Sequence, residues 1–325
     1  MTIGIIDVDG HNWPNLALMK LSGYHKAIGD DVRWWNGFEY YDVVYMSKVF
    51  DETYTADVPE PVNAKRIVKG GTGYIRRKNG ELQYFVNGVW VPALSLEGMP
   101  CIRYDEALPE EVEHAYPDYS LYPRHTANTA YGYLTRGCPN SCPFCIVSKK
   151  EGCIARKVAD LSEFWRGQKN IKLIDANLLA CKGHGDLLSQ LSDSGACVDF
   201  TQGLDCRRLT DANIAMLQNI QVKELHFAWD MQRHERAVLA GLRRYLESDP
   251  HKRHGAYATV YMLTNYDTEH DYDLYRVYTL RDMGYDPYVM VYDKPNAPKI
   301  TRDLQRWVNN RRIFRKCRNF EEYVG

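Results

Sequence analysis

The sequence predicts an α/β protein built of two units, each with a mainly parallel sheet. Short apolar runs of strand length alternate with segments whose apolar residues recur at helical spacing, first over residues 1–100 and again from residue 131 onward. Such alternation is typical of β/α units with parallel strands. The chain has 325 residues, of which 45% are hydrophobic, so it can bury the cores of two ordinary domains.

The first hundred residues are expected to form a small α/β unit. Residues 15–29 have helical spacing and end in Gly29, a plausible helix stop. Asn87 and Gly88 stand between two apolar alternations, which is a strong signal for a two-residue β-hairpin at a sheet edge. Strands are expected at residues 2–7, 31–35, 41–47 and 64–71.

Residues 101–125 are expected to be a proline-rich linker on the surface. Residues 126–295 then repeat the strand–helix alternation six times, which with right-handed crossovers would close into three-quarters of a TIM-type barrel, a partial (β/α)6 barrel. Its strands are expected at 131–135, 171–174, 197–200, 224–228, 257–262 and 286–291, and its helices near 158–166, 184–193, 210–219, 232–246 and 270–283. A helix and a basic tail are expected over residues 296–325.

Charge and hydropathy exclude several classes of function. The formal net charge is -1, so no global positive field attracts nucleic acid and no acidic excess indicates disorder. No apolar run is long enough to span a bilayer, and the first residues lack the basic start of a signal peptide and reach a charge at Asp7. We therefore expect a soluble, cytoplasmic protein without a membrane partner, whose nine cysteines are free thiols unless clustered on a metal.

Three of the cysteines are clustered in the stretch RGCPNSCPFC, residues 136–145, directly after the first strand of the second unit. Cys138, Cys142 and Cys145 would therefore lie on a loop at the carboxyl ends of the barrel strands, where such folds place their active sites. Thiols this close favour a shared metal. A zinc site would need a fourth ligand, which Cys153 or His125 could supply, and a structural iron–sulfur cluster would need a fourth cysteine. A redox disulfide between Cys142 and Cys145, or ordinary free thiols, would need no metal at all.

The C-x3-C-x2-C spacing, with Phe144 before the last cysteine, resembles the signature loop of the radical S-adenosylmethionine (radical SAM) superfamily. The resemblance implies that the three thiolates hold three irons of a [4Fe-4S] cluster, and that SAM chelates the fourth. It also implies an electron donor such as flavodoxin or ferredoxin, and reductive cleavage of SAM to a 5′-deoxyadenosyl radical. Phe144 would pack beside the cluster or the adenine.

Polar side chains follow the expected second and third barrel strands, and they would lie on the same rim as the cysteines. The resemblance implies that they line the SAM or substrate side, although the second strand lacks the glycine-glycine-acid form usual in the superfamily. A plain ion pair between Asp205 and Arg207 is the alternative. The candidates are Asp175, Asn177, Gln202, Asp205 and Arg207, with Asp230 and Asn265 as weaker ones at the fourth and fifth strands.

The first hundred residues resemble the cobalamin (B12)-binding-like domain, a Rossmann-like parallel sheet that precedes the barrel in many radical SAM enzymes. Residues 9–11 (DGH), 47–49 (SKV) and 70–71 (GG) each follow an expected strand, where that domain has its cobalamin-ligand, serine and glycine motifs. Pro14 replaces the glycine of the ligand motif. We therefore expect the fold without bound cobalamin, with Asp9 and His11 capping a loop instead.

The resemblance implies an enzyme that abstracts hydrogen from an unidentified substrate. Three further readings of the sequence stay open. One is cobalamin-dependent methyl transfer, and another is a metal-binding scaffold that never cleaves SAM. The third is modification of a nucleic acid, which the basic tail suggests, although a charge run is usually a solvated face. The basic residues in question are Arg302, Arg306, Arg311, Arg312, Arg315, Lys316 and Arg318.

Overall fold

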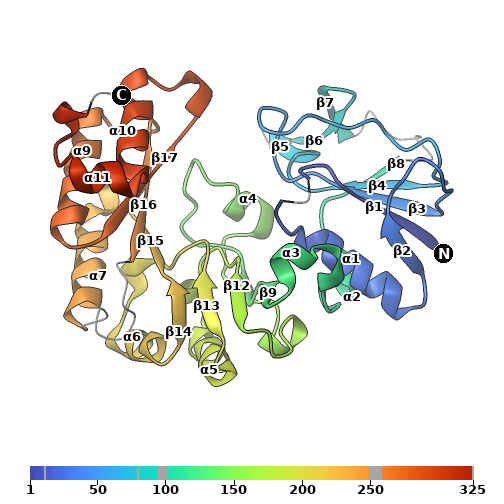
Figure 1. Ribbon diagram of the computed structural model, residues 1–325, viewed down its shortest axis with the longest axis horizontal. Coiled ribbons are helices and arrows are strands. Elements are labelled where there is room, and N and C mark those ends of the chain that lie inside the picture. Colours follow the sequence, from blue (N-terminus) through green and yellow to red (C-terminus); the bar gives the residue numbers. More distant parts are fainter. Residues whose placement is uncertain (11, 79–80, 94–101, 249–257, 324–325) are drawn as a thin grey trace. The chain divides into compact units, whose positions relative to one another are not determined.

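The computed structural model describes residues 1–10, 12–78, 81–93, 102–248 and 258–323 (Figure 1). The chain divides into two compact units, Met1–Asn128 and Thr129–Gly325. Both are α/β units with parallel sheets, as the strand–helix alternation predicts.

The first unit is built on a five-stranded parallel sheet with the order β2-β1-β3-β4-β8. Its strands are β1 (Thr2–Asp7), β2 (Asp31–Trp34), β3 (Val43–Ser47), β4 (Ile67–Gly70) and β8 (Ile102–Asp105). The last of these falls in the segment expected to be a linker. Because β8 pairs in parallel with β4 over its whole length, residues 102–105 belong to this sheet, and the chain leaves the unit only after Asn128.

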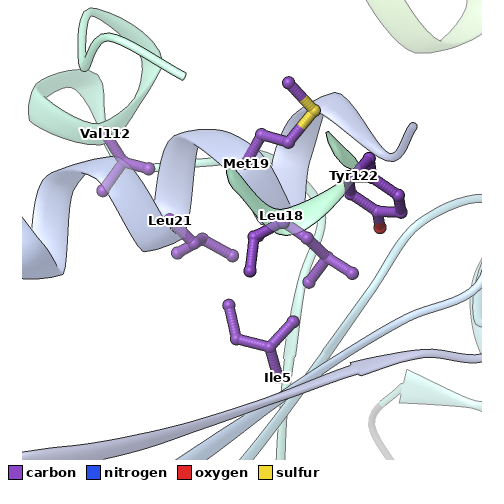
Figure 2. Close-up of a cluster of buried hydrophobic side chains, with 7 residues drawn as sticks. Ile5, Leu18, Met19, Leu21, Val112 and Tyr122 are labelled. Atoms are coloured by element: carbon purple, nitrogen blue, oxygen red, sulfur yellow. The ribbon is translucent and has the colours of Figure 1, made fainter. Parts of the chain in front are cut away.

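One face of this sheet is covered by helix α1 (Leu16–Ala27) and by the chain that follows β8. Asn15 caps the helix by accepting a hydrogen bond from the Leu18 amide. Leu18 is fully buried against Ile5 of β1, and Val112 and Tyr122 lie at opposite ends of the same cluster (Figure 2). The segment expected to be a linker thus supplies part of this hydrophobic core. Two short helices form along it, α2 (Glu110–Glu113) and α3 (Pro123–Thr126).

The opposite face carries a small antiparallel sheet of β5 (Ile75–Lys78), β6 (Glu81–Val86) and β7 (Val89–Pro92). Figure 1 shows this sheet and α1 on opposite sides of the parallel strands. The predicted hairpin is confirmed, because Asn87 and Gly88 join β6 to β7 with φ values of 47° and 84°. A left-handed pair of this kind matches the twist of the flanking strands.

The second unit contains two parallel sheets, ordered β14-β13-β12-β9 and β15-β16-β17. A single strand was expected at 224–228. The structure instead has two strands, β14 and β15, which only Leu225 separates and which belong to different sheets. A closed barrel is not formed by the strands that the structure describes. They are β9 (Thr129–Gly132), β12 (Asn170–Leu173), β13 (Cys197–Phe200), β14 (Gln221–Glu224), β15 (His226–Ala228), β16 (Thr259–Thr264) and β17 (Asp286–Val291).

Four helices connect these strands as expected, and a fifth expected helix is absent from its place. The four are α5 (His184–Ser194), α6 (Asp211–Gln218), α7 (Glu235–Glu247) and α9 (His270–Asp282). The prediction for 158–166 was wrong: Asp160 and Glu163 cap a single 3-10 turn, Leu161–Glu163. The chain then turns inward because the Phe164 ring packs on the bare backbone of Gly132. None of the helices within the described ranges is both long and apolar enough to cross a bilayer.

The C-terminal segment forms two helices, α10 (Lys299–Asn309) and α11 (Arg311–Lys316), where one was expected. Asn310 ends the first and caps the second by accepting hydrogen bonds from the amides of Arg312 and Ile313. Helix α10 covers the outer edge of β17. The Asn309 side chain accepts a hydrogen bond from the Val289 amide at 2.8 Å and donates one to the Val289 carbonyl at 2.9 Å. This side-chain amide thus satisfies backbone groups at the edge of β17, where none of the described strands pairs.

Candidate functional site

The cysteine loop leaves the carboxyl end of β9 and is closed at its base by a short ladder. There β10 (Thr135–Arg136) pairs antiparallel with β11 (Arg156–Lys157), so residues 137–155 form one stalked loop. Within it the Cys138 amide donates to the Gly152 carbonyl at 3.1 Å, and the Cys145 amide donates to the Cys142 carbonyl at 3.0 Å. Backbone hydrogen bonds thus hold the three thiols on one small scaffold.

Gly137 is the residue that lets the chain enter this loop. Its φ of +87° lies in the region that favours glycine, and a Cβ there would lie 2.2 Å from the Ile154 carbonyl oxygen. Its amide donates to the Glu151 carboxylate at 3.1 Å. The two ends of the loop therefore approach more closely than any side chain at residue 137 would allow.

Gly137→Ala is expected to disrupt the loop more severely than Gly152→Ala. Both residues have a positive φ, which strains any residue that carries a Cβ. At Gly152, however, the nearest atom to an added Cβ is the Arg156 guanidinium at 3.9 Å, so only Gly137→Ala adds a backbone clash. Limited proteolysis of the loop measures the difference. Equal cleavage of the two variants would contradict the assignment of Gly137 as the tight point.

The three thiols are free and partly buried, and they lie in one another's electrostatic field. Burial raises the pKa of the Cys142 thiol, and the nearby groups of Cys145, Asp230 and Cys138 add to the rise. Burial also raises the pKa of Cys145, to which Cys138 contributes. Thiolates gathered in this way are stabilised by a bound cation.

The thiols do not converge on a single point. Among the residues that the structure describes, no three His, Cys, Asp or Glu side chains are placed to hold one metal ion. Of the two suggested fourth zinc ligands, Cys153 is exposed and its sulfur lies 3.5 Å from the Ser141 hydroxyl of the same loop. His125 belongs to the first unit.

Asp205 gathers several of the predicted rim residues beside the loop. Arg207 donates to both of its oxygens at 2.7 Å, and Asn140 of the cysteine loop and Asn177 donate to Oδ2 at 3.1 and 3.4 Å. Burial acts to raise the pKa of Asp205, but the hydrogen bonds from Arg207, Asn140 and Asn177 outweigh it and lower the pKa. The ion pair considered from the sequence is therefore present, and it ties the end of β13 to the cysteine loop.

Asn177 presents an open acceptor next to the thiols. Its side chain is 2% exposed, and its Nδ2 lies 3.5 Å from the Cys138 sulfur as well as near Asp205. Its Oδ1 has no hydrogen-bond partner among the described residues. A buried amide oxygen without a partner is costly, so this atom is suited to accept a hydrogen bond from a bound ligand.

Asp175 is placed differently from the other rim candidates. It is 5% exposed, and its carboxylate accepts hydrogen bonds from the amides of Leu134 and Thr135 and from the Thr135 hydroxyl. Burial raises its pKa to about 6. The carboxylate thus holds the segment that leads from β9 into the cysteine loop, while Gln202, the remaining rim candidate, is exposed.

Two residues near the thiols were not singled out from the sequence. Asn140 is one, and His234 is the other, since its Nδ1 lies 3.0 Å from an Arg207 guanidinium nitrogen. Burial and the positive charge of Arg207 lower the pKa of His234. His234 follows β15 in the way that the rim candidates follow β12 and β13, and this shared position is the signal that could have found it. Phe144 contacts Tyr266 edge-on, with 5.4 Å between ring centroids.

Asp230 is expected to destabilise the protein when it ionises. Burial raises its pKa to about 6, above the value of about 3.9 for an unfolded chain. The folded state therefore holds the proton more tightly, and the free energy of unfolding should fall by about 2 kcal/mol as the pH rises from 4 to 7. Asp230→Asn keeps the acceptor for the Leu263 amide, so it should raise the melting temperature at pH 8 and leave it nearly unchanged at pH 4. An equal change at both pH values would contradict this account.

In the first unit, the residues of the cobalamin-like motifs lie together at the carboxyl edge of the sheet. Asp9 accepts hydrogen bonds from the amides of Val49 and Phe50, which joins the loops after β1 and β3. Gly71 approaches the Lys48 carbonyl so closely that a Cβ would lie 2.2 Å from it. Packing between loops thus accounts for this glycine. His11 lies outside the described residues.

Comparisons with known proteins do not assign a family. No protein-family model matches the chain, and no curated protein matches it. The side chains around the cysteine loop are therefore the basis for the function that follows.

Proposed function

We propose that the chain is a radical SAM enzyme in which Cys138, Cys142 and Cys145 bind a [4Fe-4S] cluster. The observation that carries the proposal is three free thiols on one stalked loop, at the carboxyl end of the first strand of a parallel β/α unit. The finer fold proposed is a cobalamin-binding-like sheet followed by a partial (β/α)6 barrel. The cluster, when bound, supplies the electron that cleaves SAM to a 5′-deoxyadenosyl radical.

The donor set fits a cluster better than a single ion. Each thiolate would bind a different iron, so the three sulfurs need not meet within one coordination sphere. The three thiols lie in one another's electrostatic field, as ligands of neighbouring irons would.

The neighbouring side chains supply groups of the right kind for the cosubstrate. The open amide oxygen of Asn177 can accept a hydrogen bond from the ammonium of SAM. Arg207, which is paired with Asp205, is proposed to line the SAM or substrate side next to it. Phe144 offers an apolar ring for the adenine, and Gln202 and Asp205 are proposed to contact SAM or the substrate. Asp175 is proposed to position the loop instead, because its carboxylate binds the backbone amides of Leu134 and Thr135 that lead into the loop.

Anaerobic reconstitution with iron and sulfide tests the cluster. We expect electron paramagnetic resonance to show a [4Fe-4S] signal, and chromatography to show 5′-deoxyadenosine once dithionite replaces the flavodoxin- or ferredoxin-like donor. Uptake of stoichiometric zinc with no iron would refute the cluster. A fully loaded cluster that never yields 5′-deoxyadenosine would leave a metal-binding scaffold as the better description.

Cobalamin is expected not to bind through His11. Pro14 restricts the backbone where the ligand motif has glycine, and the loops that would admit the cofactor's tail pack on each other at Gly71 and Lys48. Titration with hydroxocobalamin, followed by visible absorption, should show no ligand exchange. A spectral change that His11→Ala abolishes would reverse this expectation and favour cobalamin-dependent methyl transfer.

A further inference from the structure

A continuous row of polar and aromatic side chains crosses one face of the second unit. Tyr131, Lys172 and Asp199 are direct neighbours by strand register, and Tyr261 and Tyr288 are likewise paired. His226 joins the two groups. The members of this row, called the inner row below, are Tyr131, Lys172, Asp199, His226, Tyr261 and Tyr288.

The contacts within the inner row are close. The Lys172 ammonium lies 3.5 Å from one Asp199 oxygen, and His226 Nε2 lies 3.9 Å from the other. The His226 ring stacks flat on Tyr261, with 4.9 Å between centroids and 8° between planes. Tyr288 then meets Tyr261 edge-on at 5.7 Å.

The opposite face of the same strands is a hydrophobic core. Each inner-row residue from β12 to β17 adjoins a fully buried apolar residue that points the other way, and the Phe227 ring packs on Tyr245 of α7 at 5.1 Å. Figure 1 shows α7 and α9 along one side of β15, β16 and β17. The buried set is Ile171, Val198, Phe227, Val260 and Val289.

The inner row is not built like a packed core. The interior of a (β/α) barrel is usually filled by branched aliphatic side chains, whereas this row contains charges and phenols. Tyr288 is 43% exposed and the Lys172 side chain 30%. An exposed phenol ring such as Tyr288 is suited to stack on a planar ring, and the Lys172 ammonium at the other end of the row is suited to negative charge.

A second feature adjoins the row along β17. Residues 299–318 contain eight lysines and arginines and one aspartate, a net charge of +7 in a chain whose total is -1. All eight cations, called the basic stripe below, are exposed. Within the described part of the chain, Arg302, Arg312 and Arg315 have no acidic partner, whereas Arg306 and Arg311 lie 4.0 and 3.5 Å from carboxylates.

The basic stripe and the inner row share strand β17. Helix α10 carries the first cations of the stripe, and its Asn309 and Gln305 bind the backbone of Val289, the residue after Tyr288. Helix α10 begins at Lys299, shortly after the carboxyl end of β17 at Val291. The first cations of the stripe and Tyr288 of the inner row are therefore joined through β17.

We propose that this surface binds a single-stranded nucleic acid, with phosphates on the basic stripe and an unstacked base on the inner row. Six of the eight cations are arginines, whose forked guanidinium groups match phosphate, and bases stack on aromatic side chains when unpaired. An acidic protein or an anionic membrane surface would account for the basic stripe but would leave the inner row unexplained. The inference that this nucleic acid is the substrate of the radical SAM site rests on the proposed function. The binding itself does not require the cluster.

Fluorescence anisotropy with labelled RNA and DNA oligonucleotides of one mixed sequence tests the phosphate contacts. Arg302→Gln with Arg315→Gln removes two cations of the stripe, and Arg236→Gln with Arg243→Gln removes two exposed cations of α7 as the matched control. Only the first pair should weaken binding. For the Arg302 and Arg315 double variant, the slope of log affinity against log salt concentration should be smaller in magnitude by about 1.4. Each phosphate contact on a single strand releases about 0.7 counterion, and the variant loses two contacts.

Tyr288 tests the base contact. Tyr288→Ala should weaken oligonucleotide binding by about 5- to 150-fold without changing the salt slope, since stacking on one aromatic ring contributes about 1–3 kcal/mol. Tyr288→Phe keeps the ring and should bind nearly as the native protein does. If Tyr288 had only a structural role, loss of its ring would not weaken oligonucleotide binding while leaving the salt slope unchanged.

The outcomes are distinct. Failure of both oligonucleotides to bind, or equal weakening by the stripe pair and the α7 pair, would overturn the proposal. So would binding to phosphatidylserine vesicles in place of oligonucleotides. The titrations are run on reconstituted protein and repeated on protein without iron. Oligonucleotide binding in both, alongside failure to cleave SAM, would refute the proposed function and leave this inference standing.

Discussion

Replacing any one of Cys138, Cys142 or Cys145 with alanine is expected to abolish both iron loading and cleavage of SAM. Two thiolates cannot hold three irons, and the loop offers no replacement ligand among its described residues other than the exposed Cys153. Iron and sulfide assays after anaerobic reconstitution measure the first effect. Chromatography of 5′-deoxyadenosine after dithionite reduction measures the second, and we expect a fall to background in each variant.

Cys153→Ala and Cys317→Ala are the matched controls, because both remove a thiol that is free and outside the proposed cluster. Both should load iron like the native protein. If Cys153→Ala instead lost its metal as completely as the other three, four equivalent ligands would be present. The site would then be a closed one, of zinc or structural-cluster type, with no iron left for SAM.

Asp175→Ala is expected to unfold the entry to the cysteine loop and to lose the cluster with it. The substitution leaves the buried amides of Leu134 and Thr135 and the Thr135 hydroxyl without their acceptor. Stranding these donors should lower the free energy of unfolding by about 4 kcal/mol. Thermal denaturation and the iron content after reconstitution measure the two effects.

Asp205→Ala distinguishes this positioning role from a contact with the cosubstrate. Asp205 accepts from side chains rather than from the backbone of the loop, so its loss should leave the iron content near native while weakening SAM binding. From the sequence alone, both carboxylates were expected to behave in this second way. Normal iron loading by Asp175→Ala would restore that expectation.

The local pattern of the sequence was sufficient for most elements. Alternating periodicities predicted the strands and four connecting helices of the second unit, because side chains on strands and helices repeat with different periods. Asn87 and Gly88 predicted the hairpin because few other residues adopt its left-handed turn. The cysteine spacing likewise placed three thiols on one loop, because Cys138, Cys142 and Cys145 are close neighbours in the chain.

Elements that depend on distant partners were not predicted. Residues 102–105 are a strand only because β4 offers an edge to pair with, and nothing within that proline-rich stretch reports the pairing. The expected helix at 158–166 is a single turn because Phe164 packs on Gly132, more than thirty residues earlier. Tertiary contacts override local propensity at such places.

The sequence by itself determined which groups could carry the chemistry: three thiols at a fixed spacing, and polar residues at strand ends. Only the tertiary structure decided how those groups are used. It buries the Asp175 carboxylate against the loop backbone, pairs Asp205 with Arg207, and leaves the Asn177 oxygen open beside Cys138. The physical reason is that a hydrogen bond or a desolvated charge depends on which atoms meet in space, and strand register, not chain order, brings the ends of β9, β12 and β13 side by side.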